Sequence, residues 1–203
     1  MIIFLDFDGV LHPANANADD FFCRRELFES AISTQPKVQI VISSTWREVM
    51  SLPDLKAFFS EKIRNKILGV TPTLDDEISA YWRYEEIRLW IKRNQYAGNW
   101  LAIDDAVQEF PPACPQLIAC DAQRGFDASV ANELSKALSR MDGQTQSHQA
   151  VYAGKKEVGQ GEPSDAGPFQ SKFEASDFLP VSHDQNCAPI RHPVLPRLRW
   201  GIA

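Results

Sequence analysis

Residues 2–11 read IIFLDFDGVL, a short apolar run that passes into two acidic residues and a glycine. A run of this length and composition is typical of a strand buried inside a parallel sheet. Because side chains alternate along an extended chain, Asp6 and Asp8 are expected to point the same way. The following Gly9 allows the backbone to turn sharply out of the strand. The stretch therefore predicts a buried strand over Ile2–Phe7 that delivers two carboxylates to one place.

Apolar runs and amphipathic segments alternate along the rest of the chain as far as residue 142. The further strands are expected at Val38–Ile42, Ile67–Val70, Trp100–Ile103 and Gln116–Cys120. The helices are expected at Arg24–Ser33, Leu55–Phe59, Tyr84–Arg93 and Ala128–Arg140. Alternation of this kind predicts an α/β fold, with a doubly wound, mostly parallel sheet and helices on both of its faces. Sites in such folds lie at the carboxyl ends of the strands.

The composition changes near Gly143. Residues 143–203 are rich in Gly, Gln, Ser and Pro and hold six acidic and six basic residues, so the net charge of −6 belongs to 1–142. Low hydrophobicity without periodicity predicts a poorly ordered tail. We therefore expect a single folded domain over 1–142, followed by a C-terminal tail over 143–203.

Charge and cysteine usage narrow the class of protein. The mildly acidic net charge argues against a protein that binds nucleic acid over its whole surface. A local basic groove remains compatible with this charge. The four cysteines form no CxxC pair and no metal-ligand spacing with the four histidines, which favours reduced thiols over a disulfide or zinc framework. The N-terminus lacks the pattern of a signal peptide, and no apolar run reaches membrane-spanning length. We expect a cytoplasmic protein without membrane association or an obligate protein partner.

The paired carboxylates of Asp6 and Asp8 raise an electrostatic problem. Like charges this close repel each other in a poorly solvated site, so they need a cation or a shared proton. A hard divalent ion such as Mg²⁺ is the usual solution, because it prefers oxygen ligands. The alternative is that the two acids only cap a turn at the end of the strand.

Polar residues also follow two other expected strands. Val38–Ile42 leads into Ser43, Ser44 and Arg47, and Trp100–Ile103 leads into a pair of aspartates at 104–105. Hydroxyl and backbone N–H groups can hold phosphate oxygens, and an arginine can neutralise them. The serines could instead cap the next helix, and the aspartate pair could form a turn.

In this order, the motifs DFDGVL, an apolar strand with two serines, a basic residue at a helix start and an apolar strand with two aspartates resemble the haloacid dehalogenase (HAD) superfamily. More narrowly, the chain resembles the small HAD domain associated with RNA-repair proteins, through VISSTWRE, LGVTP, RYEEIRLWI, WLAIDDA and LIACDAQRGF. The resemblance covers about residues 2–140. It implies a Rossmann-like HAD fold and a Mg²⁺-dependent phosphohydrolase.

The resemblance implies a role for each matching residue. Asp6 would attack phosphorus and become an aspartyl-phosphate, which splits the hydrolysis into two easier steps. Asp8 would protonate the leaving oxygen and then deprotonate the attacking water. Ser43 would hold the phosphoryl oxygens, with Ser44 and Arg47 as further substrate contacts.

The implied metal ligands are Asp6, the main chain of Asp8, and the aspartate pair. The position of the final motif favours Asp105 as the direct ligand, with Asp104 as the other candidate. Two arginines of one helix remain candidates for the basic residue of the third motif. Arg83 stands at the helix start and fits the spacing, and Arg88 is its competitor.

Two smaller features remain outside these motifs. His12 follows Asp8 by four residues and could line the mouth of the site, but a loop histidine without a role is the favoured interpretation. Asp121 and Gly125 follow the last strand and are expected to shape a turn.

The spacing leaves no room for a cap domain. About a dozen residues separate Gly9 from the helix near Arg24, and about 40 separate Ser44 from Arg83. A capless site is open, so the expected substrate is a phosphorylated small molecule or nucleic-acid end, with nucleotide or polynucleotide-end phosphate favoured by analogy with the family. The alternative is a catalytically idle HAD-fold binding or regulatory module, against which stands the presence of all four aspartates. A dehalogenase has no need of the second aspartate, so Asp8 argues against that class.

Overall fold

The computed structural model describes residues 1–74 and 79–153, with the side chains described as far as residue 141. Its centre is a five-stranded sheet in the order β3-β2-β1-β4-β5, and all four pairings of neighbouring strands are parallel. The strands are β1 (Ile2–Leu5), β2 (Gln39–Ile42), β3 (Ile67–Val70), β4 (Trp100–Asp104) and β5 (Leu117–Ala119). The predicted α/β fold with a parallel sheet is confirmed.

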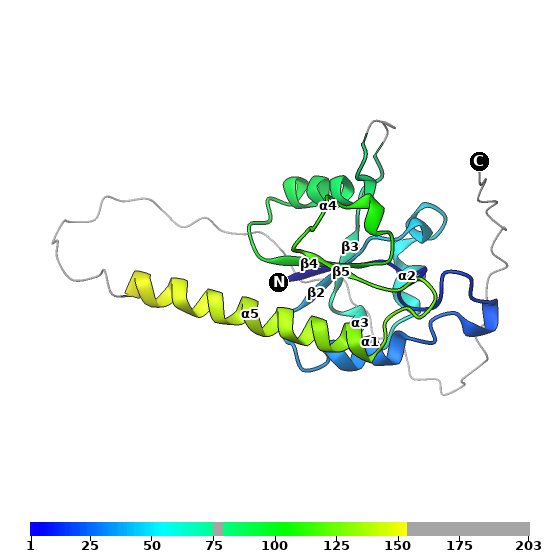
Figure 1. Cartoon of the computed structure of the whole chain (residues 1–203), viewed down its shortest axis with the longest axis horizontal. Helices are drawn as coiled ribbons and strands as arrows, with labels where there is room; N and C mark the ends of the chain where they lie inside the picture. The colour runs from blue at the N-terminus through cyan, green and yellow to red at the C-terminus, as the bar shows by residue number, and fades with distance from the viewer. Residues whose placement is uncertain (75–78, 154–203) are drawn as a thin grey trace, which may run out of the picture. The chain divides into compact units, whose positions relative to one another are not determined.

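Helices cover both faces of this sheet. They are α1 (Arg25–Ile32), α2 (Leu52–Ala57), α3 (Glu61–Arg64), α4 (Trp82–Arg93) and α5 (Ala128–Ala153), with short 3₁₀ turns η1 (Ala18–Asp20), η2 (Thr45–Glu48) and η3 (Val107–Glu109). In Figure 1, α4 lies on one face of the sheet and α1 and α5 lie on the other. The arrangement is the doubly wound one that the alternating pattern predicts.

β1 is the central strand, which explains its unbroken apolar sequence. All four of its residues are buried, because helices close both faces and a strand pairs along each edge. On the α4 side, Phe4 packs edge-to-face against Trp90 and Trp100, with ring centroids 5.5 and 5.7 Å apart. On the other side, Phe28 of α1 meets Phe126 edge-to-face at 5.5 Å.

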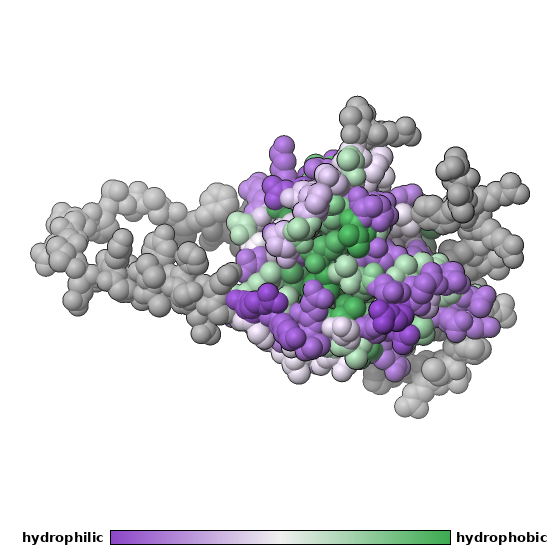
Figure 2. Space-filling view, viewed as in Figure 1, coloured by the Kyte–Doolittle hydropathy of each residue, from purple (hydrophilic) through white to green (hydrophobic). Residues whose placement is uncertain are grey.

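The core reaches the surface at the β5 edge of the sheet. Figure 2 shows apolar residues gathered between α4 and α5, with hydrophilic residues around them. Leu117 of β5 and Cys114 before it are partly buried and pack against the core cluster that contains Trp100 and Phe110. Because β5 is an edge strand that pairs with β4 alone, residues beside it stay partly exposed.

The strand order places a topological switch point beside β1. The chain runs outward from β1 to β2 and β3, then crosses back to form β4 on the opposite side of β1. Leu5 pairs with Ile42 and with Ile103, so the residues that follow these three strands emerge side by side. Ligands of open α/β sheets bind in the crevice at such a point.

Several element boundaries differ from the expected ones. The helix expected at Leu55–Phe59 begins at Leu52, because Ser51 caps it by accepting a hydrogen bond from the Asp54 N–H. A second short helix between Ser44 and Arg83 was left open by the sequence, and α3 is that helix; its four residues are too few for a periodic signal that would set its range. The strands end within two residues of their expected positions, and β3 matches its expected range.

The last helix is much longer than expected. It continues from the predicted end at Arg140 to Ala153, because a single glycine such as Gly143 costs a helix only about 1 kcal/mol and does not stop it. The predicted boundary between 142 and 143 therefore falls inside α5. The expectation of a poorly ordered tail concerns residues that, beyond 153, lie outside the described part of the chain.

The described segments between the motifs hold no inserted cap domain. Between β1 and α1 the chain forms turns and η1, and between β2 and α4 the described residues form η2, α2, α3 and β3. No helix in 1–74 or 79–153 is long and apolar enough to cross a membrane.

A chain that ends at Asp142 is expected to fold and to keep any phosphatase activity of the parent. The side chains of α5 that are buried in the described part of the helix are Val130, Leu134 and Leu138, and all three precede the cut. The melting temperature and the rate of hydrolysis of a small aryl phosphate should match those of the full chain. Insoluble protein would show that the segment after Asp142 contributes to the core.

Candidate active site

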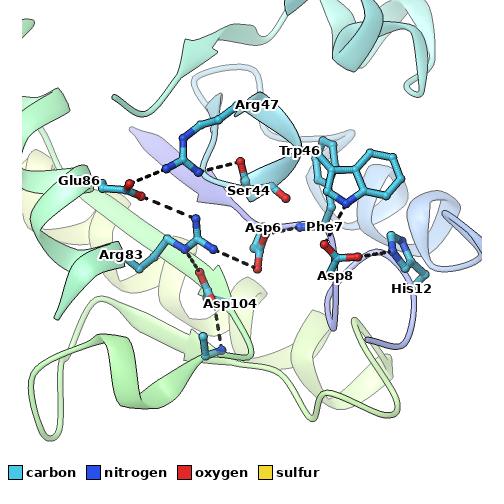
Figure 3. A network of polar contacts seen from close by, with 11 residues as sticks. Asp6, Phe7, Asp8, His12, Ser44, Trp46, Arg47, Arg83, Glu86 and Asp104 are labelled. Carbon is cyan, nitrogen blue, oxygen red and sulfur yellow. Dashed lines mark hydrogen bonds and ion pairs between the residues drawn. The ribbon is translucent and has the colours of Figure 1, made fainter. Parts of the chain in front are cut away.

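The carboxyl ends of three strands bring the predicted residues together. Asp6 follows β1, Ser43 follows β2, and Asp104 ends β4. The Asp6 N–H donates to the Ile103 carbonyl at 3.1 Å and the Ser43 N–H to the Leu5 carbonyl at 2.8 Å, so the sheet ladder itself fixes their spacing. Figure 3 shows Asp6 between Arg83 on one side and Asp8 on the other.

Arg83 links the helix layer to this edge of the sheet. It lies in the first turn of α4, where its Nη2 is 3.8 Å from Asp6 Oδ2 and its Nε is 3.3 Å from Asp104 Oδ2. Its side chain is 8% exposed. Burial alone would lower the pKa of Arg83, but Asp6, Asp104 and Glu86 together raise it, so the guanidinium stays charged. Arg88, the competing candidate, is exposed on the same helix.

Asp6 is a buried carboxylate with a perturbed pKa. Its Oδ1 accepts the Phe7 N–H at 2.8 Å. Burial raises the pKa of Asp6 to about 6, although Arg83 and the Phe7 N–H act in the opposite direction. Burial and a charged partner that perturb a carboxylate in this way are common at functional sites.

Three carboxylates form a cluster that could hold a metal ion. Oxygen atoms of Asp6, Asp104 and Asp105 lie within 4.8 Å of one another. Burial raises the pKa of both Asp104 and Asp105, and the charge of Asp6 raises that of Asp104 further. Hard oxygen donors in this number suit Mg²⁺, and a cation would relieve the repulsion among them. The residues therefore fit the magnesium site that the sequence predicts.

Gly9 allows Asp105 to approach this cluster. A Cβ atom at position 9 would lie 2.2 Å from Asp105 Oδ2, and the backbone there has a φ of +67°. Both the space and the left-handed conformation require glycine. The DFDG motif and the aspartate pair are thus in direct van der Waals contact.

Asp8 lies outside the metal-ligand cluster. Its side chain is 43% exposed, and its two oxygens meet His12 Nε2 at 3.1 Å and Trp46 Nε1 at 2.8 Å. The side chain of Asp8 is thus absent from the cluster of Asp6, Asp104 and Asp105, and its main chain as a metal ligand stays a prediction. The assignment of Asp8 as proton donor stays a prediction.

Hydroxyl groups that follow β2 and β3 are buried. Ser43 Oγ and Thr71 Oγ1 are buried without a hydrogen-bond partner among the described residues. Ser44 lies close enough to Asp6 to help lower the pKa of that carboxyl. Buried hydroxyls without a partner are rare, and a phosphoryl group or water at this edge would satisfy them.

Arg47 is turned into the protein. Its Nη2 lies 2.5 Å from Glu86 Oε1 and its Nη1 donates to the Ser44 carbonyl at 2.7 Å, and its side chain is only 3% exposed. Burial lowers the pKa of Arg47 and raises that of Glu86, and each counteracts the shift of the other. A direct contact between Arg47 and substrate stays a prediction.

Three residues of this site were not assigned a role from the sequence. Glu86 bridges the two arginines, since its Oε2 lies 3.7 Å from Arg83 Nη1. Its spacing of three residues from Arg83 on a helix was the available signal.

His12 was expected to be a loop histidine without a role, yet it is 1% exposed and contacts Asp8. Trp46 gave no signal beyond its position after the serines. The turn expected at Asp121 and Gly125 is present, with Gly125 at a φ of +64°.

A parallel α/β sheet with an aspartate after its central strand and an aspartate pair after the neighbouring strand defines the class of HAD-type hydrolases. A family model described as "HAD domain in Swiss Army Knife RNA repair proteins" matches residues 2–131. The chain belongs to this family. Neither the curated proteins nor the solved structures contain a significant match to it.

Metal-free protein should gain stability from Asp6 as the pH falls from 7 to 5. The pKa of Asp6 is about 6 in the folded protein against an ordinary 3.8, so the folded state takes up a proton in this window before the unfolded chain does. Relative to Asp6→Asn, the parent in EDTA should gain about 3 °C in Tm, the shift that roughly 1 kcal/mol produces in a domain of this size. Saturating Mg²⁺ should remove the difference, and a pH-independent difference in EDTA would contradict the assigned environment of Asp6.

Proposed function

We propose that this protein is a Mg²⁺-dependent phosphomonoester hydrolase that acts through an aspartyl-phosphate on Asp6. The observation that carries the proposal is the placement of Asp6 at the switch point, between the Arg83 guanidinium and two further aspartates. A nucleophile in this position has a positive charge on one side and metal-ligand oxygens on the other, which suits an in-line transfer of a charged phosphoryl group.

In the first step a carboxylate oxygen of Asp6 attacks phosphorus. The new bond between that oxygen and phosphorus forms as the bond to the leaving oxygen breaks, and the electron pair stays on the leaving oxygen. Asp8, in its protonated form, gives its proton to that oxygen, so an alcohol departs. The Ser43 hydroxyl donates to a phosphoryl oxygen, and Arg83 balances the charge that collects around Asp6.

In the second step water attacks the same phosphorus from the face that the alcohol has left. The Asp8 carboxylate accepts a proton from the water, the bond from phosphorus to Asp6 breaks, and the electron pair returns to the Asp6 carboxylate. Inorganic phosphate leaves, and both aspartates regain their starting forms. Asp6 thus forms and then releases one bond to phosphorus, and Asp8 donates and then accepts one proton.

Asp6, Asp105 and the main chain of Asp8 would hold Mg²⁺, with Asp104 as a further ligand or as the partner that orients Arg83. The ion would neutralise phosphoryl oxygens and align them with Asp6. Asp104 is held by Arg83 and by the Ala106 N–H at 2.9 Å, whereas half-buried Asp105 lies against Gly9 and outside the contact with Arg83 that Asp104 makes. These contacts support Asp105 as the direct ligand.

The favoured substrate is a nucleotide or a polynucleotide-end phosphate, in a cytoplasmic setting. The RNA-repair context of the family supports this class, and the absence of a cap among the described segments supports access for a large substrate. A panel of phosphorylated nucleotides, 3′- and 5′-phosphorylated oligonucleotides, phosphosugars and phosphopeptides with Mg²⁺ tests it. Binding of such ligands without turnover would favour the alternative, a catalytically idle HAD-fold module.

Asp6→Asn should abolish turnover and leave the fold intact. The amide is nearly isosteric with the carboxylate but is a poor nucleophile, so no aspartyl-phosphate can form. Hydrolysis of the best ester in the panel, with circular dichroism as the check on folding, gives the answer. Retention of more than a few per cent of the parent rate in Asp6→Asn would rule out the covalent mechanism.

The parent should lose activity in EDTA and regain it with Mg²⁺ better than with Ca²⁺, whose coordination shell is larger and looser.

Arg83→Ala should lower kcat/KM by about 30- to 1000-fold, which corresponds to roughly 2–4 kcal/mol of transition-state stabilisation. Arg88→Ala is the matched control on the same helix, and as an exposed position it should cost less than about 1 kcal/mol. Because Arg83 is buried among carboxylates, Arg83→Lys is measured alongside it as a variant that keeps the charge. A larger loss at Arg88 than at Arg83 would reverse the assignment of the third motif.

A further inference from the structure

Both oxygens of Asp8 are held by nitrogen donors of other side chains. The Trp46 Nε1–H donates to Oδ2 at 2.8 Å, and His12 Nε2 lies 3.1 Å from Oδ1. Figure 3 shows Asp8 between these two rings, on the side of Asp6 away from Arg83. A carboxylate that is 43% exposed would otherwise turn freely between rotamers. These two contacts fix one orientation.

The surroundings of His12 determine which of its nitrogens carries a proton. The Phe22 N–H points at Nδ1, at 3.4 Å, so a proton on Nδ1 would place two donors face to face. Nδ1 is therefore the acceptor, and Nε2 carries the N–H that reaches Asp8. The ring is 1% exposed and lies against Phe21 and Trp46, with centroids 4.8 and 5.8 Å away. His12 has no room to swing away from Asp8.

Trp46 is fixed in a similar way. It belongs to η2, directly after the serines of β2, and is 8% exposed. Its ring packs edge-on against Phe22 and Phe58, with centroids 5.5 and 5.6 Å away. The indole can therefore keep its N–H aimed at Asp8, while Ser44 lies close to Asp6.

We propose that His12 and Trp46 are positioning residues that hold the Asp8 carboxylate in the orientation needed for proton transfer to the leaving group. The proposal rests on the function proposed above. A carboxylate has about four lone-pair sites, so two donors leave room for the proton and for the leaving oxygen. Fixing the carboxylate removes its rotational freedom before the reaction. This raises the reaction rate only for substrates whose leaving group needs the proton of Asp8.

Two esters of the same site separate this role from a structural one. A phosphate ester of 4-nitrophenol has a leaving group that departs without a proton, whereas an ester of a primary alcohol needs one. Since kcat/KM reports the steps up to the first departure, a change in the ratio of kcat/KM for the two esters from parent to variant reports on proton donation. A residue that only stabilises the fold would change both values equally.

The variants are His12→Leu and Trp46→Phe, each of which removes one N–H donor and keeps an apolar side chain. Each should lower kcat/KM for the alkyl ester by about 10- to 100-fold and for the aryl ester by less than about threefold. His12→Gln retains an N–H donor and should recover most of the loss. Phe28→Leu, which alters core packing against Phe126 and not the contacts of Asp8, is the control and should leave the ratio unchanged.

Equal losses for both esters, or no loss in either donor variant, would overturn the proposal. A parent that hydrolyses neither ester would refute the proposed function instead. In that case, and where a variant fails to fold, NMR of the ¹⁵N-histidine-labelled parent remains decisive, with the His12 signals assigned by their loss in His12→Gln. A proton on Nε2 of His12 is expected, and a proton-free Nε2 would exclude the donor role.

Discussion

Arg83 places one guanidinium within 4 Å of three buried carboxylates, those of Asp6, Asp104 and Glu86. Burying charges is costly unless partners and hydrogen bonds compensate for the lost water. The three acids come from β1, β4 and α4, so this one side chain connects the central strand, its neighbour and the helix above them. Any shift of α4 along the sheet would break the pairing, so the surroundings of Asp6 depend on where this helix packs.

The cluster nevertheless carries more negative than positive charge. Two arginines, Arg47 and Arg83, face four carboxylates that are buried or half-buried in the same network, those of Asp6, Glu86, Asp104 and Asp105. With all groups ionised, four negative charges against two positive ones leave a deficit of two. Burial raises the pKa of each of these acids, so the protein alone resists full ionisation. A divalent cation at Asp6, Asp104 and Asp105 would balance the network.

The sequence predicted the sheet and the main site residues because both follow from local signals. The strands are mostly apolar, and β1 is apolar and buried over its whole length. The polar residues that matter stand directly at the ends of β1, β2 and β4. Parallel register then brings those ends together without further information. The direction of the Arg47 side chain and the bridging role of Glu86 could not be predicted. They depend on how α4 packs against η2, a contact between segments about 40 residues apart.

Asp6 and Asp8 show how two like residues in one motif acquire different surroundings. β1 ends at Leu5, so the strict alternation of side chains along a strand stops before the second aspartate is reached. Asp6 enters the buried ion cluster, where the Arg83 guanidinium lies beside it. Asp8 remains partly exposed and meets the ring nitrogens of His12 and Trp46 instead. A carboxylate tied to a metal or an arginine is poorly suited to giving and taking a proton, so a site that needs both a nucleophile and a proton carrier gains by keeping the two apart.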